Sequence, residues 1–125
     1  MSDEPKANEI NIDVTKICEQ MKIRPTIYVK LVTSFTESLE HKFNVFQQAL
    51  EQNNREQMRM IMHEIKGTAS NLRLNNIIGP QAVLHTAVKA GEKKEALSRH
   101  FEILKDEADR LRAYVVHMNH ENNDT

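Results

Sequence analysis

The sequence predicts an all-α chain, folded as an antiparallel four-helix bundle with a short additional helix at its N-terminus. Only three glycines and three prolines occur in 125 residues, which is too few turn signals for a fold built from many short strands. Between these turn signals, apolar residues recur with the spacing of helices that bury one face. A chain of this length with 39% hydrophobic residues has the size of one domain. Four amphipathic helices with short loops favour a bundle.

The N-terminal segment divides into a disordered stretch and a short helix. Residues 1–9 are polar and acidic, and we expect them to be disordered. Apolar residues then follow a helical spacing, with Asp13 as the expected N-cap. They are Ile10, Ile12, Val14, Ile17 and Met21. This helix would cover one end of the core. The bundle would span residues 10–120, with a frayed C-terminus at 121–125.

The next two helices should form a hairpin. Pro25 suits the first position of a long helix, which keeps its apolar spacing almost to Gln52. Its apolar residues are Ile27, Leu31, Val32, Phe35, Leu39, Phe43, Phe46 and Leu50. Asn53-Asn54 makes a turn and caps the following helix, which should run from about residue 55 to 72. Two long helices joined by so short a turn pack antiparallel.

Two glycines mark the remaining helix boundaries. Gly79-Pro80 indicates a break, with a shorter helix that starts at Pro80 and ends at Gly91. Its apolar residues are Val83, Leu84, Ala87 and Val88. The last helix should begin near Glu92 and continue to about His117 or beyond. Its apolar positions are Ala96, Leu97, Phe101, Leu104, Ala108, Leu111, Val115 and Met118.

One histidine lies opposite the apolar stripe of the helix at 55–72. At about 100° per residue, the buried stripe consists of Met58, Ile61, Met62, Ile65, Ala69 and Leu72. His63, Gly67 and Ser70 point roughly 120–180° away from this stripe, with Lys66 in between. The imidazole of His63 should therefore face water. On spacing alone, a solvated histidine without a function is the more common case.

The neighbours of His63 favour a functional role. Lys66 lies one turn further on, where its ammonium can reach a group attached to the imidazole. Gly67 lies four residues after His63, although glycine inside an exposed helix costs roughly 0.5–1 kcal/mol relative to alanine. Bare helix surface onto which another molecule can press would explain this glycine.

The segment His63-x-Ile-Lys66-Gly67-Thr-Ala-Ser-x-Leu72 resembles the signature of histidine-containing phosphotransfer (HPt) domains. The resemblance includes a phenylalanine at Phe35, the Asn53-Asn54 turn and the turn Ala90-Gly91-Glu92. It covers nearly the whole chain after about residue 12.

Two residues depart from the family pattern. Arg73 stands where the family usually has glycine, which bears on how the histidine helix ends. His85 stands where the family often has Glu or Gln near the phosphohistidine. As a neutral imidazole, His85 could accept a hydrogen bond from the ring nitrogen of His63 that is not phosphorylated. A half-buried residue that only fills space is the alternative.

The resemblance implies a phosphocarrier that is not itself an enzyme. His63 would accept a phosphoryl group from a receiver-domain aspartate of a hybrid sensor kinase or response regulator. It would then pass the group to another receiver in a multistep phosphorelay. The receiver would supply the aspartate, the Mg²⁺ and most of the catalysis, and this chain would need no cofactor of its own.

The chemistry of the residues is compatible with this role. An exposed imidazole is mostly neutral at cellular pH, and neutral imidazole is a competent nucleophile. Phosphoryl transfer depends mainly on positioning and charge stabilisation. Lys66 can supply charge, and Ser70 could hydrogen-bond the phosphoryl group. The sequence contains no glycine-rich phosphate loop and no paired carboxylates beside His63.

A docking face beside His63 is also predicted. Arg55, Arg59, Lys66 and Arg73 are spaced by i+4, i+11 and i+18, which gives one basic stripe along the flank of His63. Met60 should be an exposed apolar residue on the other flank. Together they would dock a receiver domain, with the stripe attracting its acidic pocket. A solvated charge run and an isolated surface methionine are the alternatives.

Composition argues against several other classes. A net charge of −1 gives no overall field for nucleic acid or an anionic membrane. No run approaches the ~18 apolar residues of a membrane span, and the single Cys18 excludes an internal disulfide. We expect a cytoplasmic monomer. A non-catalytic interaction bundle is the main alternative. A metal-binding bundle is less favoured, because only His117 and His120 have i, i+3 spacing.

Overall fold

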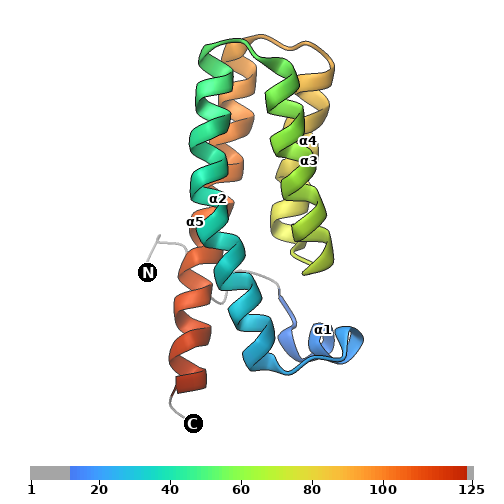
Figure 1. The fold of residues 1–125 in the computed structure, drawn as a ribbon, viewed down its shortest axis with the longest axis vertical. Coiled ribbons are helices and arrows are strands. Elements are labelled where there is room, and N and C mark those ends of the chain that lie inside the picture. The colour runs from blue at the N-terminus through green and yellow to red at the C-terminus, as the bar shows by residue number, and fades with distance from the viewer. Residues whose placement is uncertain (1–11, 124–125) are drawn as a thin grey trace, which may run out of the picture.

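The computed structural model describes residues 12–123, and all regular structure in this part of the chain is helical (Figure 1). The helices are α1 (Val14–Met21), α2 (Pro25–Glu51), α3 (Arg55–Asn71), α4 (Asn75–Lys89) and α5 (Lys94–Asn123). The predicted all-α class is confirmed. The stretch 1–9 that we expect to be disordered lies outside the described residues. α5 extends to Asn123 and therefore continues into the segment 121–125, where we expect fraying.

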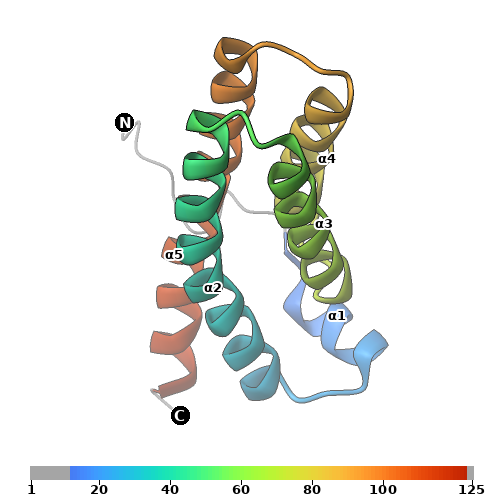
Figure 2. The same cartoon turned by 45° about the horizontal axis from the view of Figure 1, so that its top comes forward.

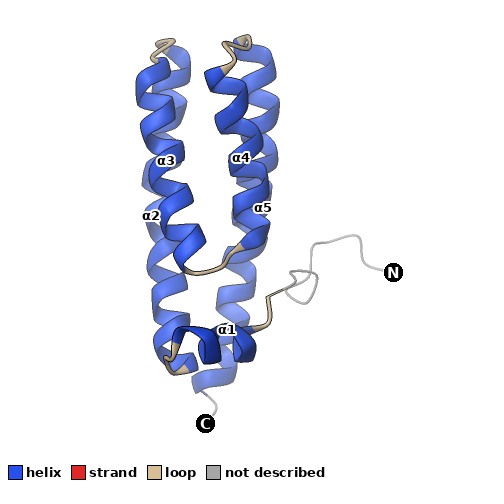
Figure 3. Ribbon diagram, turned by 90° about the vertical axis from the view of Figure 1, so that its right-hand side faces the viewer, coloured by secondary structure: helices blue, strands red, loops and turns tan. Residues whose placement is uncertain are grey.

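The four longer helices lie lengthwise beside one another, and α1 lies across one end (Figures 1, 2 and 3). Contacts join α2 to α3, α3 to α4, α4 to α5 and α5 back to α2. α2 and α5 extend beyond α3 and α4 at the end where α1 lies (Figure 3). α1 contacts α2 at this end, which agrees with the prediction that the first helix covers one end of the core.

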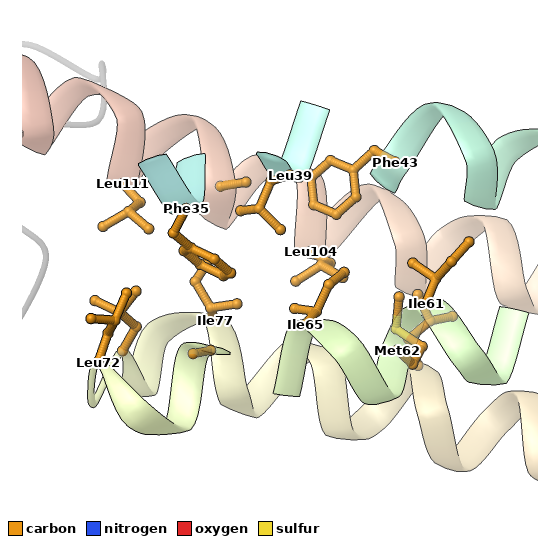
Figure 4. Packing of buried hydrophobic residues seen from close by; sticks show 14 of the residues in the cluster. Phe35, Leu39, Phe43, Ile61, Met62, Ile65, Leu72, Ile77, Leu104 and Leu111 are labelled. Atoms are coloured by element: carbon orange, nitrogen blue, oxygen red, sulfur yellow. The ribbon is translucent and has the colours of Figure 1, made fainter. Parts of the chain in front are cut away.

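Apolar side chains of α2, α3, α4 and α5 meet between these helices (Figure 4). The whole predicted stripe of α3 is buried, with no member more than 5% exposed. Burial of each large apolar side chain contributes roughly 1.5–3 kcal/mol. The core therefore fixes which face of α3 turns outward.

Three predicted core residues are exposed instead. Ile27 and Leu31 are 44% and 43% exposed, because Tyr28, Val29 and Val32 form the buried face at this end of α2. Val83 is 53% exposed on α4. At these positions apolar residues occur on both the buried and the exposed face of the helix. The spacing of apolar residues alone therefore does not show which face is buried.

Side-chain caps begin α1 and α3 at the predicted residues. Asp13 Oδ1 accepts a hydrogen bond from the backbone N–H of Lys16 at 3.1 Å. Asn54 Oδ1 accepts from the N–H of Gln57 at 3.1 Å. Asn53 has φ 55°, a left-handed conformation that asparagine tolerates better than most residues. The turn between α2 and α3 is therefore confirmed.

The predicted break at Gly79-Pro80 is wrong, because α4 begins at Asn75 and continues through both residues. Pro80 is the sixth residue of α4 and has no backbone N–H, so the carbonyl of Asn76 lacks its usual helical donor. Leu74, Ile77, Gln81 and Leu84 repeat at helical spacing, and none is more than 1% exposed. The polar Gln81 interrupts this buried stripe in the sequence.

The end of α3 is held by its connection to α4 and by α2. Arg73 has φ 57°, so arginine adopts the left-handed conformation that glycine adopts without strain. The N–H of Leu74 donates to the carbonyl of Ala69 at 2.9 Å. From α2, the buried hydroxyl of Tyr28 donates to the carbonyl of Leu72 at 2.7 Å. Burial raises the pKa of Tyr28 to about 12. The helix thus ends normally although Arg73 replaces the glycine usual in the family.

Arg73→Gly should raise the free energy of unfolding by up to about 1 kcal/mol. A non-glycine residue in the left-handed region costs roughly 1–2 kcal/mol, and the greater entropy of glycine in the unfolded chain offsets part of the gain. Urea denaturation measures the change. Asn71→Gly, at the last helical residue of α3, is the matched control and should destabilise the fold. Equal destabilisation by both variants would contradict this account of Arg73.

Candidate functional site

His63 is exposed on α3, and its neighbours Met62 and Ile65 are buried in the core. The core therefore holds the helix so that the imidazole faces outward, as its position opposite the apolar stripe predicts. Lys66, Gly67 and Ser70 are also exposed on α3. A Cβ atom built on Gly67 meets nothing within 4 Å, so the described chain leaves open space beside this glycine.

A pocket adjoins His63 and is formed by α3 and α4 together. From α3 it is lined by Arg59, Met60 and His63, and from α4 by His85 and Lys89. The structure thus places His85 in the same pocket as His63, as the resemblance suggests. Lys66, Gly67 and Ser70 do not line it. They continue along the exposed face of α3 toward its C-terminal end.

Cationic side chains gather around this pocket. Burial lowers the pKa of His85, and the charges of Lys89, His63, Lys66 and Arg59 lower it further. His85 is therefore mostly neutral at pH 7. Two glutamates, Glu56 and Glu64, also line the pocket, but Glu64 is paired with Lys42 of α2 at 3.1 Å.

Lys89 is a pocket residue that the sequence reasoning missed. It lies four residues after His85 on α4, which places both side chains on one face of the helix. That spacing is the signal that could have identified it. Its ammonium adds a cation from a second helix to the surroundings of His63.

A side-chain hydrogen bond from Gln81 links α4 to α3 next to His63. It is 1% exposed, and its Nε2 donates a hydrogen bond to the carbonyl of Met62 at 3.0 Å. Met62 immediately precedes His63. The same Nε2 lies 3.5 Å from Nδ1 of His85. A buried amide therefore contacts both the backbone beside His63 and the histidine that shares its pocket.

The residues of the predicted docking face differ in their surroundings. Met60 is 53% exposed, and Arg59 is exposed beside it. Arg55 is half-buried, and its Nη2 donates to the carbonyl of Glu92 in the α4–α5 connection at 2.8 Å. Arg73 lies beyond the end of α3, where its Nη1 donates to the carbonyl of Asn71 at 2.8 Å. Of the four residues in the basic stripe, Arg59 and Lys66 are therefore the two that are exposed and lie within α3.

A second, more apolar pocket lies among α1, α2 and α3. Met21, Leu31, Phe35 and Leu72 contribute apolar surface to it, and Thr68 lies beside them on α3. The sequence reasoning assigned Leu31 to the core and therefore missed this surface. Thr68 directly follows Gly67, so this pocket adjoins the same exposed segment of α3.

The histidines outside α3 and α4 are not grouped into a metal site in the described part of the chain. Among these residues, no cluster of three or more His, Cys, Asp or Glu side chains could hold a metal ion. The ring of His117 lies 6.4 Å from that of Tyr114, and the side chain of His120 lies outside the described residues. Cys18 is buried, and burial raises the pKa of its thiol.

No helix within residues 12–123 combines the length and the apolar character that crossing a lipid bilayer requires.

The sequence of the chain matches a model of a known protein family. A family model described as the Hpt domain matches residues 30–114, which include all of α3 and α4. The chain belongs to the Hpt domain family. The resemblance predicted from the His63 segment is thereby confirmed. Hpt domains serve in histidine phosphotransfer within phosphorelays and interact with receiver domains. Neither the curated proteins nor the solved structures contain a match to the chain.

Proposed function

We propose that this Hpt protein is a phosphocarrier whose antiparallel four-helix bundle presents His63 as the phosphoacceptor. His63 would receive the phosphoryl group from a receiver-domain aspartate and pass it to another receiver. The observation that carries the proposal is the exposed imidazole of His63 in a pocket lined by cations from two helices. The family match places this histidine helix within the Hpt domain.

The transfer needs little covalent machinery from this chain. A ring nitrogen of neutral His63 attacks the phosphorus of an aspartyl phosphate, and the N–P bond forms as the P–O bond to aspartate breaks. Aspartate leaves as a carboxylate, and the ring proton of the imidazole passes to solvent. The receiver supplies Mg²⁺, which neutralises charge on the phosphoryl oxygens.

Residues around His63 would assist by charge and by hydrogen bonding. Lys66, Arg59 and Lys89 place positive charge near the phosphoryl oxygens. Ser70 lies on the exposed face of α3 and can donate its hydroxyl proton to a phosphoryl oxygen. The chain would carry the phosphoryl group without a kinase site of its own. We further propose that it acts as a cytoplasmic monomer, which fits its single buried cysteine.

The proposal is tested by incubating the full chain with a phosphorylated receiver domain. A phosphocarrier takes up phosphate that is labile in acid and stable in alkali, as a phosphoramidate is. A purely structural interaction bundle could bind the receiver but would take up no phosphate. If the chain binds receivers that phosphorylate other Hpt domains but takes up no phosphate from them, the proposal is contradicted.

Met60→Glu should weaken receiver binding about tenfold. Met60 is 53% exposed and lines the His63 pocket, so a receiver that reaches His63 would cover it and desolvate the introduced carboxylate. The dissociation constant is measured with His63 intact. Ile103→Glu is a matched control, because Ile103 is 55% exposed on α5. Wild-type affinity of Met60→Glu would place the docking surface elsewhere, with the pocket at Leu31 and Thr68 as the next candidate.

Arg59→Glu should lower the association rate severalfold at low ionic strength. Receiver phosphorylation pockets are acidic, and an exposed cation beside His63 accelerates encounter through long-range attraction. The effect should fade as salt shortens the Debye length to about 8–10 Å. Stopped-flow binding at several salt concentrations measures it. Arg99→Glu, an equal charge change at an exposed residue of α5, should have a smaller effect. A salt-independent rate would contradict steering by this stripe.

A further inference from the structure

The amide of Gln81 has a fixed orientation in the interior. Its Nε2 donates to the carbonyl of Met62 at 3.0 Å, and a carbonyl oxygen can accept this bond in addition to its helical one. Its Oε1 is buried and has no hydrogen-bond partner among the described residues. Turning the amide over would bring two oxygens together at Met62 and lose a buried hydrogen bond. The Nε2 end is therefore held against α3.

This orientation determines what His85 can offer on each side of its ring. The second N–H of Gln81 Nε2 is available to Nδ1 of His85, 3.5 Å away. An N–H facing Nδ1 requires a lone pair on Nδ1. A neutral imidazole has one lone pair and one N–H, so its proton then lies on Nε2. Nε2 is the ring nitrogen that Gln81 does not contact, and His85 lines the pocket of His63.

We propose that Gln81 is a positioning residue that fixes His85 as the Nε2–H tautomer, so that His85 presents a hydrogen-bond donor to the His63 pocket. This inference rests on the proposed function of His63. It gives His85 the opposite role to the acceptor expected from the sequence. The resemblance leads us to expect Glu or Gln at this position: the carboxylate of Glu could only accept, whereas the amide of Gln could also donate.

A donor at this point favours the phosphorylated state of His63. In neutral phosphohistidine, one ring nitrogen carries phosphorus and the other holds a lone pair. Protonation of that lone pair speeds cleavage of the N–P bond, because the ring then leaves as neutral imidazole. A neutral donor that occupies the lone pair competes with its full protonation and so lowers the population of the rapidly cleaved form, and a donor that binds a phosphoryl oxygen stabilises the bound group directly. The pocket would thus lengthen the lifetime of the phosphoryl group.

The first test is the tautomer of His85 in the unphosphorylated wild-type chain. Long-range ¹H–¹⁵N correlation spectra, recorded at a pH where His85 is neutral, distinguish protonated from unprotonated ring nitrogens. We expect a pyrrole-type Nε2 and a pyridine-type Nδ1. A pyridine-type Nε2 would overturn the proposal. This measurement does not depend on phosphate uptake, so its result is separate from the success or failure of the proposed function.

The second test is the lifetime of phosphohistidine after phosphorylation of the chain with phosphoramidate. Gln81→Met keeps the side-chain length and removes the amide, and it should shorten the lifetime about two- to tenfold, the range of one net hydrogen bond. In a His85→Phe background, Gln81→Met should have no further effect. An equal effect in both backgrounds would show that Gln81 acts through helix packing alone and would overturn the proposal. If Gln81→Met fails to fold, the tautomer of His85 in the wild-type chain decides whether the proposal holds.

Discussion

His63→Gln should abolish phosphate uptake from a phosphorylated receiver domain. The amide of glutamine is not a nucleophile toward an aspartyl phosphate, whereas neutral imidazole is. The effect should be complete, because the one other histidine that lines the pocket, His85, is half-buried on α4 and therefore less accessible to a receiver than the exposed His63. Labelling with radioactive phosphate, followed by separation under alkaline conditions, measures it.

The fold of this variant should be unchanged. His63 is exposed, and glutamine has at least as high a helix propensity as histidine, so the free energy of unfolding should change by less than about 0.5 kcal/mol. His41→Gln is a matched control, since His41 is exposed on α2 and should leave labelling intact. Substantial labelling of His63→Gln, or its loss in both variants, would refute the assignment of His63.

Features encoded by neighbouring residues could be predicted from the sequence. The apolar stripe of α3 follows from the helical period, and burial of its six members confirms it. The caps at Asp13 and Asn54 form with backbone groups three residues away. Such features need no knowledge of the surrounding fold. The outward face of α3, and with it the position of His63, is predicted for the same reason.

Features that depend on another helix could not be predicted. Gln81 is polar and looks exposed in the sequence, yet it is buried because its amide meets the carbonyl of Met62 on α3. The start of α4 is predicted too late for a different reason: Gly79-Pro80 indicates a break in the sequence, whereas α4 begins at Asn75 and continues through both residues. Arg55 fits a basic stripe by spacing, but its guanidinium binds the carbonyl of Glu92. Lys89 has one signal in the sequence, its spacing of four residues from His85, but this spacing points to the His63 pocket only once α4 is known to pack beside α3.

Gly67→Gln should slow phosphotransfer by about tenfold or more, while the fold is retained. Gly67 is exposed four residues after His63, and a Cβ built there meets nothing within 4 Å. Packing inside the described chain therefore does not require glycine at this position. Its φ is also not in the left-handed region, so alanine fits the helix and should stabilise it by roughly 0.5–1 kcal/mol.

The remaining explanation for Gly67 is clearance for the partner. A receiver must bring its phosphorylated aspartate to within bonding distance of His63, and a displacement of about 1 Å can lower such a rate about 100-fold. A glutamine side chain one helical turn from His63 would prevent that approach. The transfer rate is measured by rapid quench with one phosphorylated receiver. Gly79→Gln is the matched control, because Gly79 is also an exposed helical glycine with nothing within 4 Å of its built Cβ. The Gly79 variant should transfer at the wild-type rate. A wild-type rate for Gly67→Gln would exclude clearance as the reason for this glycine.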